Sequence, residues 1–581
     1  MCGIIGRSGD GNSIQMILGG IKDLEYRGYD SFGIAFIESD SLVIKKDAGR
    51  IDDIIEEFDL RSCKSNISIA HTRWATHGKA TAENAHPFVD CTRNFAVVHN
   101  GIIENYNELK KNLNKHQFLS ETDSEVLVHM LEENIKGGLS LMDSIKKIMN
   151  EIKGSSAFAF ISLKERQIVA AKKGSPLVFG VGENANYISS DVQSLINYTN
   201  KYIFLVDGDI VKFSSHTYKI ENVIKRIKHK TERIDSHGIR YDLGKFNHFM
   251  EKEIFDQFKM WESYKNTDNI LLEKVSNVLK NARRIYIIGS GSSYYASEYG
   301  AFLFRDAGFD ALAIEPQQVR NYKKIIDTND CIFIVSQSGE TFDIINNLEY
   351  FKKNIKIALI NTLYSSLTRS VDIVIPMNAG TEKSVAATKS VGASLLFFII
   401  LYSKLSNRET STDLEFLLNN RFNIYVPSVE NLVNKVSEAL NKFKSVFIVA
   451  RNEDCPIALE GALKLKEVSY VNATAIDMAT MKHGPLALIT NDSLVIAIVS
   501  PGTEKDAVNN LEEIRSRGAY IVGISTSNMT KFDLYIRTVN AGIFYPIPIL
   551  FIFQMLAYKT SIKNKIDPDK PRNLAKSVTV K

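Results

Sequence analysis

The chain has 581 residues, of which 44 % are hydrophobic and 24 % charged, as in ordinary globular proteins that fold into about two to four domains. The 71 Lys and Arg residues against 67 Asp and Glu leave a net charge of +4, too small for so long a chain to indicate a nucleic acid partner. Five cysteines without CxxC spacing predict neither a disulfide framework nor a zinc site, and they fit a reducing cytoplasm.

Targeting and membrane segments are not expected either. The N-terminus MCGIIGRSGD has no basic segment followed by a long apolar one, so it does not resemble a signal peptide. Two apolar stretches, near Leu395–Leu401 and Ile543–Leu556, are shorter than the roughly 20 residues that a membrane span needs. We therefore expect two buried core helices and no membrane.

The first part of the chain, residues 2–216, is rich in short apolar or alternating runs interrupted by two helical stretches, residues 13–25 and 124–135. The runs are Gly33–Glu38, Asn66–His71, Phe95–His99, Ala157–Leu163 and Ile203–Val206. Strands interleaved with helices in this way predict a layered α+β domain. Residues 217–262 are basic, then polar, then helical in pattern, and they predict a linker.

After residue 263 the pattern changes to short apolar strands that alternate with helices, which is typical of a doubly wound parallel sheet. The strands expected in this region are Ile285–Ile288, Cys331–Val335, Ile357–Ile360 and Ile373–Ile375. Two of these segments recur roughly 160 residues later, as VFIVARNEDCPIA and NDSLVIAIVSPGTEKDAVNNL, so the unit is duplicated. The predicted domains are 263–420 and 421–565, and residues 566–581 form a C-terminal tail.

Cys2 is the first candidate for chemistry. Removal of Met1 would place its thiol beside a free α-amine, whose ordinary pKa of about 7.7–8.0 suits a base near neutrality. The chain end would then supply both nucleophile and base. The alternative is an incidental cysteine near the start of the chain.

Three further groups extend this candidate site. The guanidinium of Arg73 suits a carboxylate, the amide of Asn100 followed by the N–H of Gly101 can form an oxyanion hole, and Asp123 can pair with an ammonium. Each has a plain alternative: a surface ion pair, a hairpin turn and a helix N-cap. Together they suit the amide and the amino-acid end of glutamine.

At this point the sequence resembles a known family. MCGIIG, EYRGYDS, AHTRWATHG and HNGIIENY resemble the class II glutamine amidotransferases. Over essentially the whole chain, up to the C-terminal PRNLAKSVTV, the sequence resembles the glutamine–fructose-6-phosphate aminotransferases (isomerizing), also called glucosamine-6-phosphate synthases.

For residues 2–216 the resemblance implies an Ntn-hydrolase fold, a four-layer αββα sandwich that hydrolyses glutamine through a thioester on Cys2. It implies that the α-amine of Cys2 is the base, that Asn100 and Gly101 form the oxyanion hole, and that Arg73 and Asp123 hold the amino-acid end. It also implies further glutamine contacts from Trp74, Thr76, His77 and His86, with Trp74 gating the path of ammonia.

The second half resembles two sugar isomerase (SIS) domains, each flavodoxin-like α/β. Two Ser/Gly-rich loops, residues 289–293 and 336–341, each lie between a strand and a helix, where backbone N–H groups and hydroxyls can bind phosphate. For either loop alone, a helix cap is the alternative. The resemblance implies that a sugar phosphate is bound by Ser290, Ser292, Ser293, Ser336, Gln337, Ser338, Thr341, Val385 and Ala387.

Lys464 and Glu467 are three residues apart in a helical pattern and share a face, where a solvated ion pair is the alternative. The resemblance implies that Glu467 moves a proton between C1 and C2 of the sugar with help from Lys464, and that Lys576 forms a Schiff base with the ketose. It implies that His483 opens the sugar ring from the other subunit of a homodimer, that the tail closes the active site, and that no metal or other cofactor is needed.

The sequence departs from the family pattern mainly around the sugar site, at Ser290, Gln318, Ala387 and Thr480, and also in the linker at Asp256–Phe258. The expected reaction is D-fructose 6-phosphate with L-glutamine giving D-glucosamine 6-phosphate and L-glutamate. Two alternatives stay open: the same class of enzyme acting on another sugar phosphate, and a non-catalytic regulator that binds a sugar phosphate.

Overall fold

The computed structural model describes residues 2–74, 78–234, 242–527, 529 and 532–577. The chain divides into two compact units, built mainly on residues 1–241 and 242–576.

The first unit contains an eight-stranded sheet whose strands are all paired antiparallel. In spatial order its strands are β14 (Glu232–Arg233), β11 (Lys201–Phe204), β9 (Val178–Val181), β10 (Ala185–Ser189), β1 (Gly3–Gly9), β4 (Ile67–Arg73), β2 (Ser31–Glu38) and β3 (Ser41–Ala48). Helices α1 (Ser13–Asp23) and α2 (Ile51–Glu57) bury their apolar faces against one side of it.

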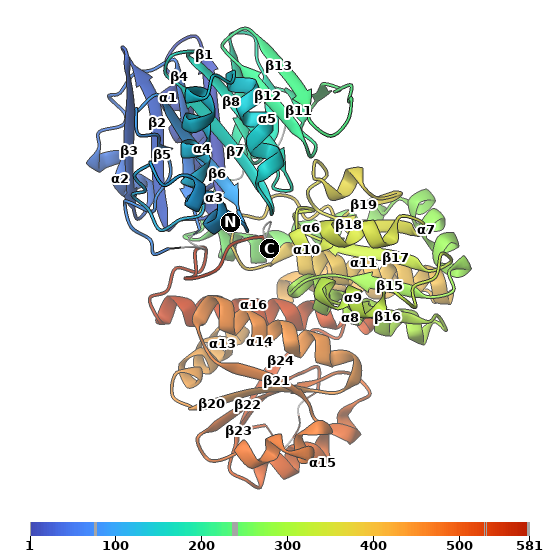
Figure 1. Cartoon of the computed structure of the whole chain (residues 1–581). Coiled ribbons are helices and arrows are strands. Elements are labelled where there is room, and N and C mark those ends of the chain that lie inside the picture. Colours follow the sequence, from blue (N-terminus) through green and yellow to red (C-terminus); the bar gives the residue numbers. More distant parts are fainter. Residues whose placement is uncertain (1, 75–77, 235–241, 528, 530–531, 578–581) are drawn as a thin grey trace. The chain divides into compact units, whose positions relative to one another are not determined.

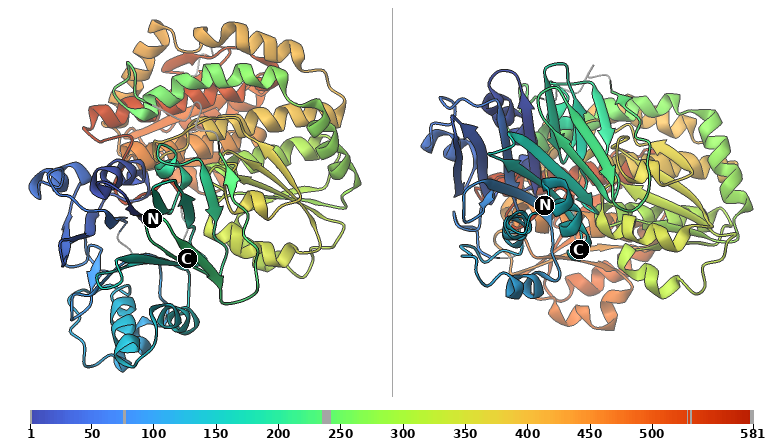
Figure 2. Two further views of the ribbon diagram at one scale, coloured as in Figure 1. Left: turned by 90° about the horizontal axis from the view of Figure 1, so that it is seen from above. Right: turned by 45° about the horizontal axis from the view of Figure 1, so that its top comes forward.

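A second, six-stranded antiparallel sheet stacks on the other side. Its order is β13 (Tyr218–Asn222), β12 (Asp209–Phe213), β8 (Gln167–Lys173), β7 (Ser156–Ser162), β6 (Phe95–Gly101) and β5 (Phe88–Val89). One apolar core fills the space between the sheets, and another lies between the second sheet and helices α4 (Val126–Lys136) and α5 (Leu141–Glu151). Figure 2 shows the blue and green strands as stacked layers. The predicted αββα sandwich is confirmed.

The second unit holds two five-stranded parallel sheets. In spatial order, the strands of the first sheet are β16 (Ala311–Ile314), β15 (Ile285–Ile288), β17 (Cys331–Ser336), β18 (Ile355–Ile360) and β19 (Ile373–Pro376). Those of the second sheet are β21 (Ala473–Asp477), β20 (Ser445–Ala450), β22 (Ser493–Val499), β23 (Tyr520–Ser525) and β24 (Leu534–Arg537). Counted along the chain, both sheets have the strand order 2-1-3-4-5 of flavodoxin-like folds. The duplication predicted from the sequence is confirmed strand by strand.

Helices between the two sheets of the second unit form one continuous core. They are α6 (Phe249–Ser263), α7 (Asn269–Asn281), α8 (Ser292–Asp306), α11 (Lys389–Ser406), α13 (Pro427–Leu440), α14 (Cys455–Ser469) and α16 (Pro546–Lys563). The opposite face of the first sheet carries α9 (Val319–Tyr322) and α10 (Phe342–Asn347), and that of the second carries α15 (Glu504–Arg515). Figure 1 shows α14 and α16 on one face of the second sheet and α15 on the other.

The two long apolar stretches lie in α11 and α16. Both helices are long and apolar enough to cross a membrane, but 78 % and 83 % of their most apolar windows are buried inside the protein. They are central members of the shared core, as predicted from their length and composition.

The region predicted as a linker, residues 217–262, contains regular structure. Strands β13 and β14 pair within the first unit, and α6 buries Met250, Ile254 and Trp261 in the core of the second. Strands β13 and β14 are short and contain few apolar residues, so the sequence shows no apolar or alternating pattern that would predict them.

Candidate functional site

Cys2 immediately precedes β1, whose first residue lies opposite Thr72 of β4. Its Sγ lies 3.7 Å from the carbonyl oxygen of Trp74, and its own carbonyl accepts a hydrogen bond from Arg27 Nε at 3.1 Å. Arg27 is buried and lies 3.7 Å from Asp191, which also accepts the hydroxyl of Tyr26 at 2.6 Å. The EYRGYDS motif therefore holds the backbone of the predicted nucleophile.

Asn100 lies at the end of β6, and its amide is oriented from both sides. His71 Nε2 lies 2.9 Å from the carbonyl oxygen of His99 and 3.1 Å from Asn100 Oδ1, so this nitrogen carries the proton. Burial lowers the pKa of His71 to about 3, which keeps the ring neutral. Asn100 Nδ2 donates to Ser190 Oγ at 2.8 Å, and the same oxygen accepts the N–H of Ile4 at 2.8 Å.

Gly101 follows with a φ of +137°, a conformation that favours glycine. A Cβ at this position would lie 1.9 Å from the carbonyl oxygen of Ser155. No other residue fits without moving the neighbouring backbone, so the close approach of residues 155 and 156 requires a glycine after Asn100.

Arg73, at the end of β4, is buried in the same region. Burial lowers its pKa, and the negative charges of Cys2, Asp30 and Asp123 oppose that shift, so these groups lie within electrostatic reach of the guanidinium. Asp123 is also buried, and its Oδ2 accepts the N–H of Ile103 at 2.6 Å. The structure thus brings together the predicted nucleophile and both predicted clamps for the amino-acid end of glutamine.

His86 stacks on His71 with ring centroids 4.1 Å apart. Burial holds the pKa of His86 well below its usual range, and neither ring nitrogen has a hydrogen-bond partner among the described residues. His86 is therefore a neutral, buried ring within electrostatic reach of Arg73. Two further predicted contacts, Thr76 and His77, lie outside the described residues.

In the second unit, the two Ser/Gly loops follow β15 and β17, which are neighbouring strands of the first parallel sheet. In the strand order 2-1-3-4-5 this pair flanks the point where the order reverses, which is where ligands bind in open α/β sheets. Ser336 Oγ accepts the N–H of Gly339 at 3.0 Å, and Ser290 Oγ is buried without a partner among the described residues. Ser293, Gln337, Ser338 and Thr341 are partly exposed along the same two loops.

Ser292, at the start of α8, joins this edge to helix α14. Its hydroxyl donates to Glu460 Oε1 at 3.0 Å and lies 3.2 Å from Lys464 Nζ. Lys464 is fully buried and also lies 3.4 Å from Glu460 and 2.6 Å from Glu467. About two turns of one helix therefore place one cation between two carboxylates.

The two carboxylates of this cluster differ in environment. Glu460 is buried, and burial raises its pKa to about 7 although Lys464 opposes the shift. Glu467 retains 23 % exposure of its side chain. Burial alone would lower the pKa of Lys464, but the two carboxylates raise it. The lysine therefore stays charged, Glu460 can hold a proton near neutrality, and Glu467 faces an accessible side.

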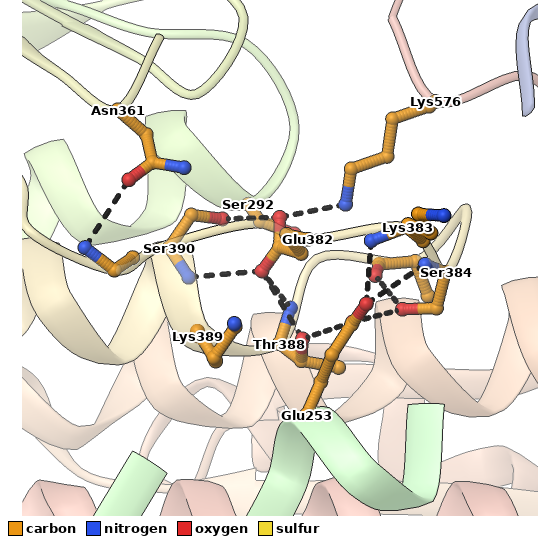
Figure 3. Close-up of polar contacts among 12 residues, drawn as sticks. Glu253, Ser292, Asn361, Glu382, Lys383, Ser384, Thr388, Lys389, Ser390 and Lys576 are labelled. Atoms are coloured by element: carbon orange, nitrogen blue, oxygen red, sulfur yellow. Dashed lines mark hydrogen bonds and ion pairs between the residues drawn. The ribbon is translucent and has the colours of Figure 1, made fainter. Parts of the chain in front are cut away.

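Lys576 is held by Glu382, in the loop between β19 and α11 that also carries Val385 and Ala387. The Nζ–Oε2 distance is 2.6 Å and both side chains are almost completely buried (Figure 3). Burial would raise the pKa of Glu382, but Lys576 and the N–H groups of Ser390 and Thr388 lower it to about 2.

A second carboxylate, Glu253 of α6, supports this loop from beneath. It accepts the N–H groups of Lys383 and Ser384 at 2.5 and 3.0 Å and the hydroxyl of Thr388 at 2.8 Å (Figure 3). The tail is fixed in turn, because Asp569 accepts the first N–H groups of α6 at 2.8 and 2.7 Å and its carbonyl accepts the N–H of Val385 at 3.2 Å.

His483 is exposed, in a short 3-10 helix over Thr480–His483. Within the described part of one chain, no contact joins it to Lys464, Glu467 or Lys576. This is the one catalytic candidate of the second unit that the structure leaves outside these two clusters.

Sequence reasoning overlooked four residues of these sites: His71, Ser190, Glu382 and Glu460. Glu460 had a signal, since it precedes Lys464 by four residues and so shares its helix face. The other three act across 29 to 194 residues of chain, and no local pattern identifies them.

The raised pKa of Glu460 predicts a pH dependence of stability. A carboxyl whose folded pKa is about 7 and whose ordinary pKa is 4.5 adds stability below pH 4.5, and this stability is lost as pH rises through 7. The shift corresponds to at most about 3 kcal/mol. Thermal unfolding of wild type and Glu460→Gln from pH 4.5 to about 8 should show the wild type losing stability relative to the variant as pH rises. A constant difference would contradict the assignment.

Comparisons with known proteins identify the two types of domain that carry these candidate sites. The glutamine amidotransferase domain model matches residues 71–197, and the SIS domain model matches 278–404 and 439–558. The glutamine–fructose-6-phosphate aminotransferases (isomerizing) of Thermococcus kodakarensis and Aquifex aeolicus are 36 % and 37 % identical, each over 100 % of both chains. The solved C-terminal domain of glucosamine-fructose-6-phosphate aminotransferase from Francisella tularensis covers 57 % of this chain and 100 % of its own, with 25 % identity and a TM-score of 0.51.

Full-length similarity of this extent, on top of an αββα unit with a terminal cysteine and a tandem pair of flavodoxin-like sheets, shows that the chain belongs to the glutamine–fructose-6-phosphate aminotransferase (isomerizing) family.

Proposed function

We propose that this chain transfers the amide nitrogen of L-glutamine to D-fructose 6-phosphate, giving D-glucosamine 6-phosphate and L-glutamate. The observation that carries the proposal is the hydrogen-bonded cluster of Ser292, Glu460, Lys464 and Glu467, which joins the phosphate-type loop of the first SIS domain to acid–base groups of the second. The candidate glutamine site around Cys2 would supply the nitrogen that is transferred to fructose 6-phosphate.

The first half-reaction takes place at Cys2. Its sulfur attacks the side-chain amide carbon of glutamine, ammonia leaves, and water hydrolyses the thioester to glutamate. Removal of Met1 would make the α-amine of Cys2 available as the base. Asn100, oriented by His71 and Ser190, would donate to the oxyanion together with the N–H of Gly101, while Arg73 and Asp123 hold the α-carboxylate and α-ammonium.

The second half-reaction starts at Lys576. Its amine, once it has lost a proton, adds to the C2 ketone and water leaves, so a Schiff base forms; ammonia then displaces the lysine. Glu467 moves a proton from C1 to C2 to give the aldose, and the buried charge of Lys464 holds that carboxylate in place. Glu382 keeps Lys576 as a positioned ammonium until substrate arrives, because its carboxylate is buried and needs a cation.

Ring opening is assigned to His483. Since this residue lies outside the two clusters within one chain, we propose that it acts on the substrate held by a second copy in a homodimer.

Substitution of the nucleophile should separate the two halves. Cys2→Ala should reduce glutamine-dependent formation of glucosamine 6-phosphate to background, while isomerisation of fructose 6-phosphate by the second unit continues. Product amino sugar and glucose 6-phosphate are quantified in the same reaction. Retained glutamine-dependent amino sugar would overturn the assignment of Cys2.

The oxyanion-hole assignment predicts a kinetic signature. Asn100→Ala should lower kcat for glutamine hydrolysis by about 100- to 1,000-fold with a small change in KM, because the amide acts on the transition state. Ser155→Ala is the matched control, since its hydroxyl pairs with Ser175 and only its backbone carbonyl approaches Gly101. A pure rise in KM for Asn100→Ala would instead indicate a ground-state contact.

The shared site predicts complementation between inactive variants. His483→Ala and Lys576→Ala should each be inactive in amino sugar synthesis, and subunits mixed by unfolding and refolding should regain about a quarter of wild-type activity, because half of the dimers would carry one intact site. Native mass spectrometry confirms that mixed dimers form. Mixed dimers without activity would place His483 in the site of its own chain.

A further inference from the structure

Four side chains of metal-ligating type converge in the first unit, apart from the residues assigned to glutamine. Cys91 lies in the turn between β5 and β6, His116 lies between α3 (Tyr106–Asn112) and α4, and His129 and Glu132 lie three residues apart on α4. One ligand atom from each lies within 4.8 Å of all the others. The four residues come from three separate segments, so the cluster is made by the tertiary fold.

The distances match those between the ligands of one small cation. Cys91 Sγ lies 3.6 Å from His116 Nδ1 and 3.8 Å from His129 Nδ1, and these nitrogens lie 3.0 and 3.5 Å from Glu132 Oε2. A tetrahedral zinc ion, with bonds of about 2.3 Å to sulfur and about 2.0–2.1 Å to nitrogen and oxygen, separates its ligand atoms by roughly 3.3–3.6 Å.

The outer atoms of both histidines point to carboxylates. His116 Nε2 lies 3.0 Å from Glu133 Oε2, and His129 Nε2 lies 3.7 Å from Glu125 Oε1. The His116 ring, which offers its Nε2 proton to Glu133, presents the lone pair of Nδ1 inward, as metal-bound histidines with a carboxylate behind them do. His129 Nε2 lies beyond hydrogen-bond distance of Glu125, and a proton on this nitrogen would likewise turn the lone pair of Nδ1 inward. A cation between the two Nδ1 atoms and Glu132 Oε2 would then be bound by all three atoms.

We propose that Cys91, His116, His129 and Glu132 bind one Zn²⁺ ion in a structural site. A thiolate with two imidazoles selects zinc over magnesium or calcium, and four protein ligands complete a tetrahedron. Glu132 serves through Oε2 alone, since its Oε1 lies 2.7 Å from Lys136 Nζ.

The position of the site suggests what the ion would stabilise. Glu132 Oε2 also accepts the N–H of Cys91 at 3.0 Å, so the turn is already seated on α4. Glu125, beside His129, accepts the N–H groups of Leu119 and Ser120 at 2.8 and 2.7 Å. The ion would therefore tie the turn after β5 to the loop that carries Asp123, the proposed clamp for the glutamine ammonium.

The sequence predicted no zinc site because its cysteines lack CxxC spacing. That criterion detects only ligands that are close in sequence, whereas here they extend from residue 91 to residue 132. The His129-x-x-Glu132 pair on one helix face was the available signal.

Zinc titration of the full-length protein tests the proposal. Chelator-stripped wild type, titrated in competition with a chromophoric zinc chelator, should bind one equivalent with sub-micromolar affinity. Cys91→Ala and His129→Ala should weaken this binding by about 100-fold or more. Cys63→Ala and Cys2→Ala, which remove the other thiols of this unit outside the cluster, should keep the equivalent. Circular dichroism of the stripped proteins checks that each variant is folded.

Two further measurements distinguish zinc bound by these four residues from zinc bound non-specifically at the protein surface. Co²⁺ should give a thiolate charge-transfer band in wild type and Cys63→Ala that is absent in Cys91→Ala, and added zinc should raise the Tm of wild type without raising that of Cys91→Ala. Binding that is equal in wild type and Cys91→Ala would overturn the proposal. Absence of binding in wild type would overturn it as well and would leave the cluster as polar contacts around Glu132.

Discussion

The fully buried ammonium of Lys464, held between Glu460 and Glu467, is the interaction on which the sugar half of this protein depends. A charged lysine with no exposed surface is stable only if its attraction to nearby carboxylates offsets the free-energy cost of removing its charge from water. Burial raises the pKa of Glu460, the more buried of the two carboxylates; Lys464 opposes this shift and the nearby charge of Glu467 adds to it. Glu467 is the partly exposed member of the cluster, and it is the residue that we propose moves a proton on the sugar.

The duplicated fold explains why this interaction spans two domains. Both copies have the same sheet order and share one apolar core, so the helix that follows the first strand of each copy, α8 in one and α14 in the other, packs against its counterpart. Ser292 at the start of α8 can then bond directly to Glu460 on α14. The first copy keeps the Ser/Gly loops that suit a phosphate and the second supplies the proposed acid–base groups, so the proposed sugar site draws on both copies.

Much of this could be predicted from the sequence, because the relevant signals are local. Apolar runs such as Ile285–Ile288 predicted buried parallel strands, the repeat predicted two like domains, and the motifs around Cys2 and Asn100 predicted a glutamine site. The supporting groups could not be predicted. His71 and Ser190 orient Asn100 across two sheets, and Glu382 meets Lys576 across most of the second unit. Such pairs are formed by tertiary packing, so no regular spacing in the sequence connects the two residues.

Coupling of glutamine hydrolysis to amination of fructose 6-phosphate in one chain can be measured directly. The most direct test is to incubate the purified protein with both substrates and to quantify L-glutamate and D-glucosamine 6-phosphate in the same samples over time. We expect equal amounts of the two products throughout the reaction. Glutamate that accumulates without amino sugar would contradict the coupling and would show that glutamine is hydrolysed without transfer of its nitrogen to fructose 6-phosphate.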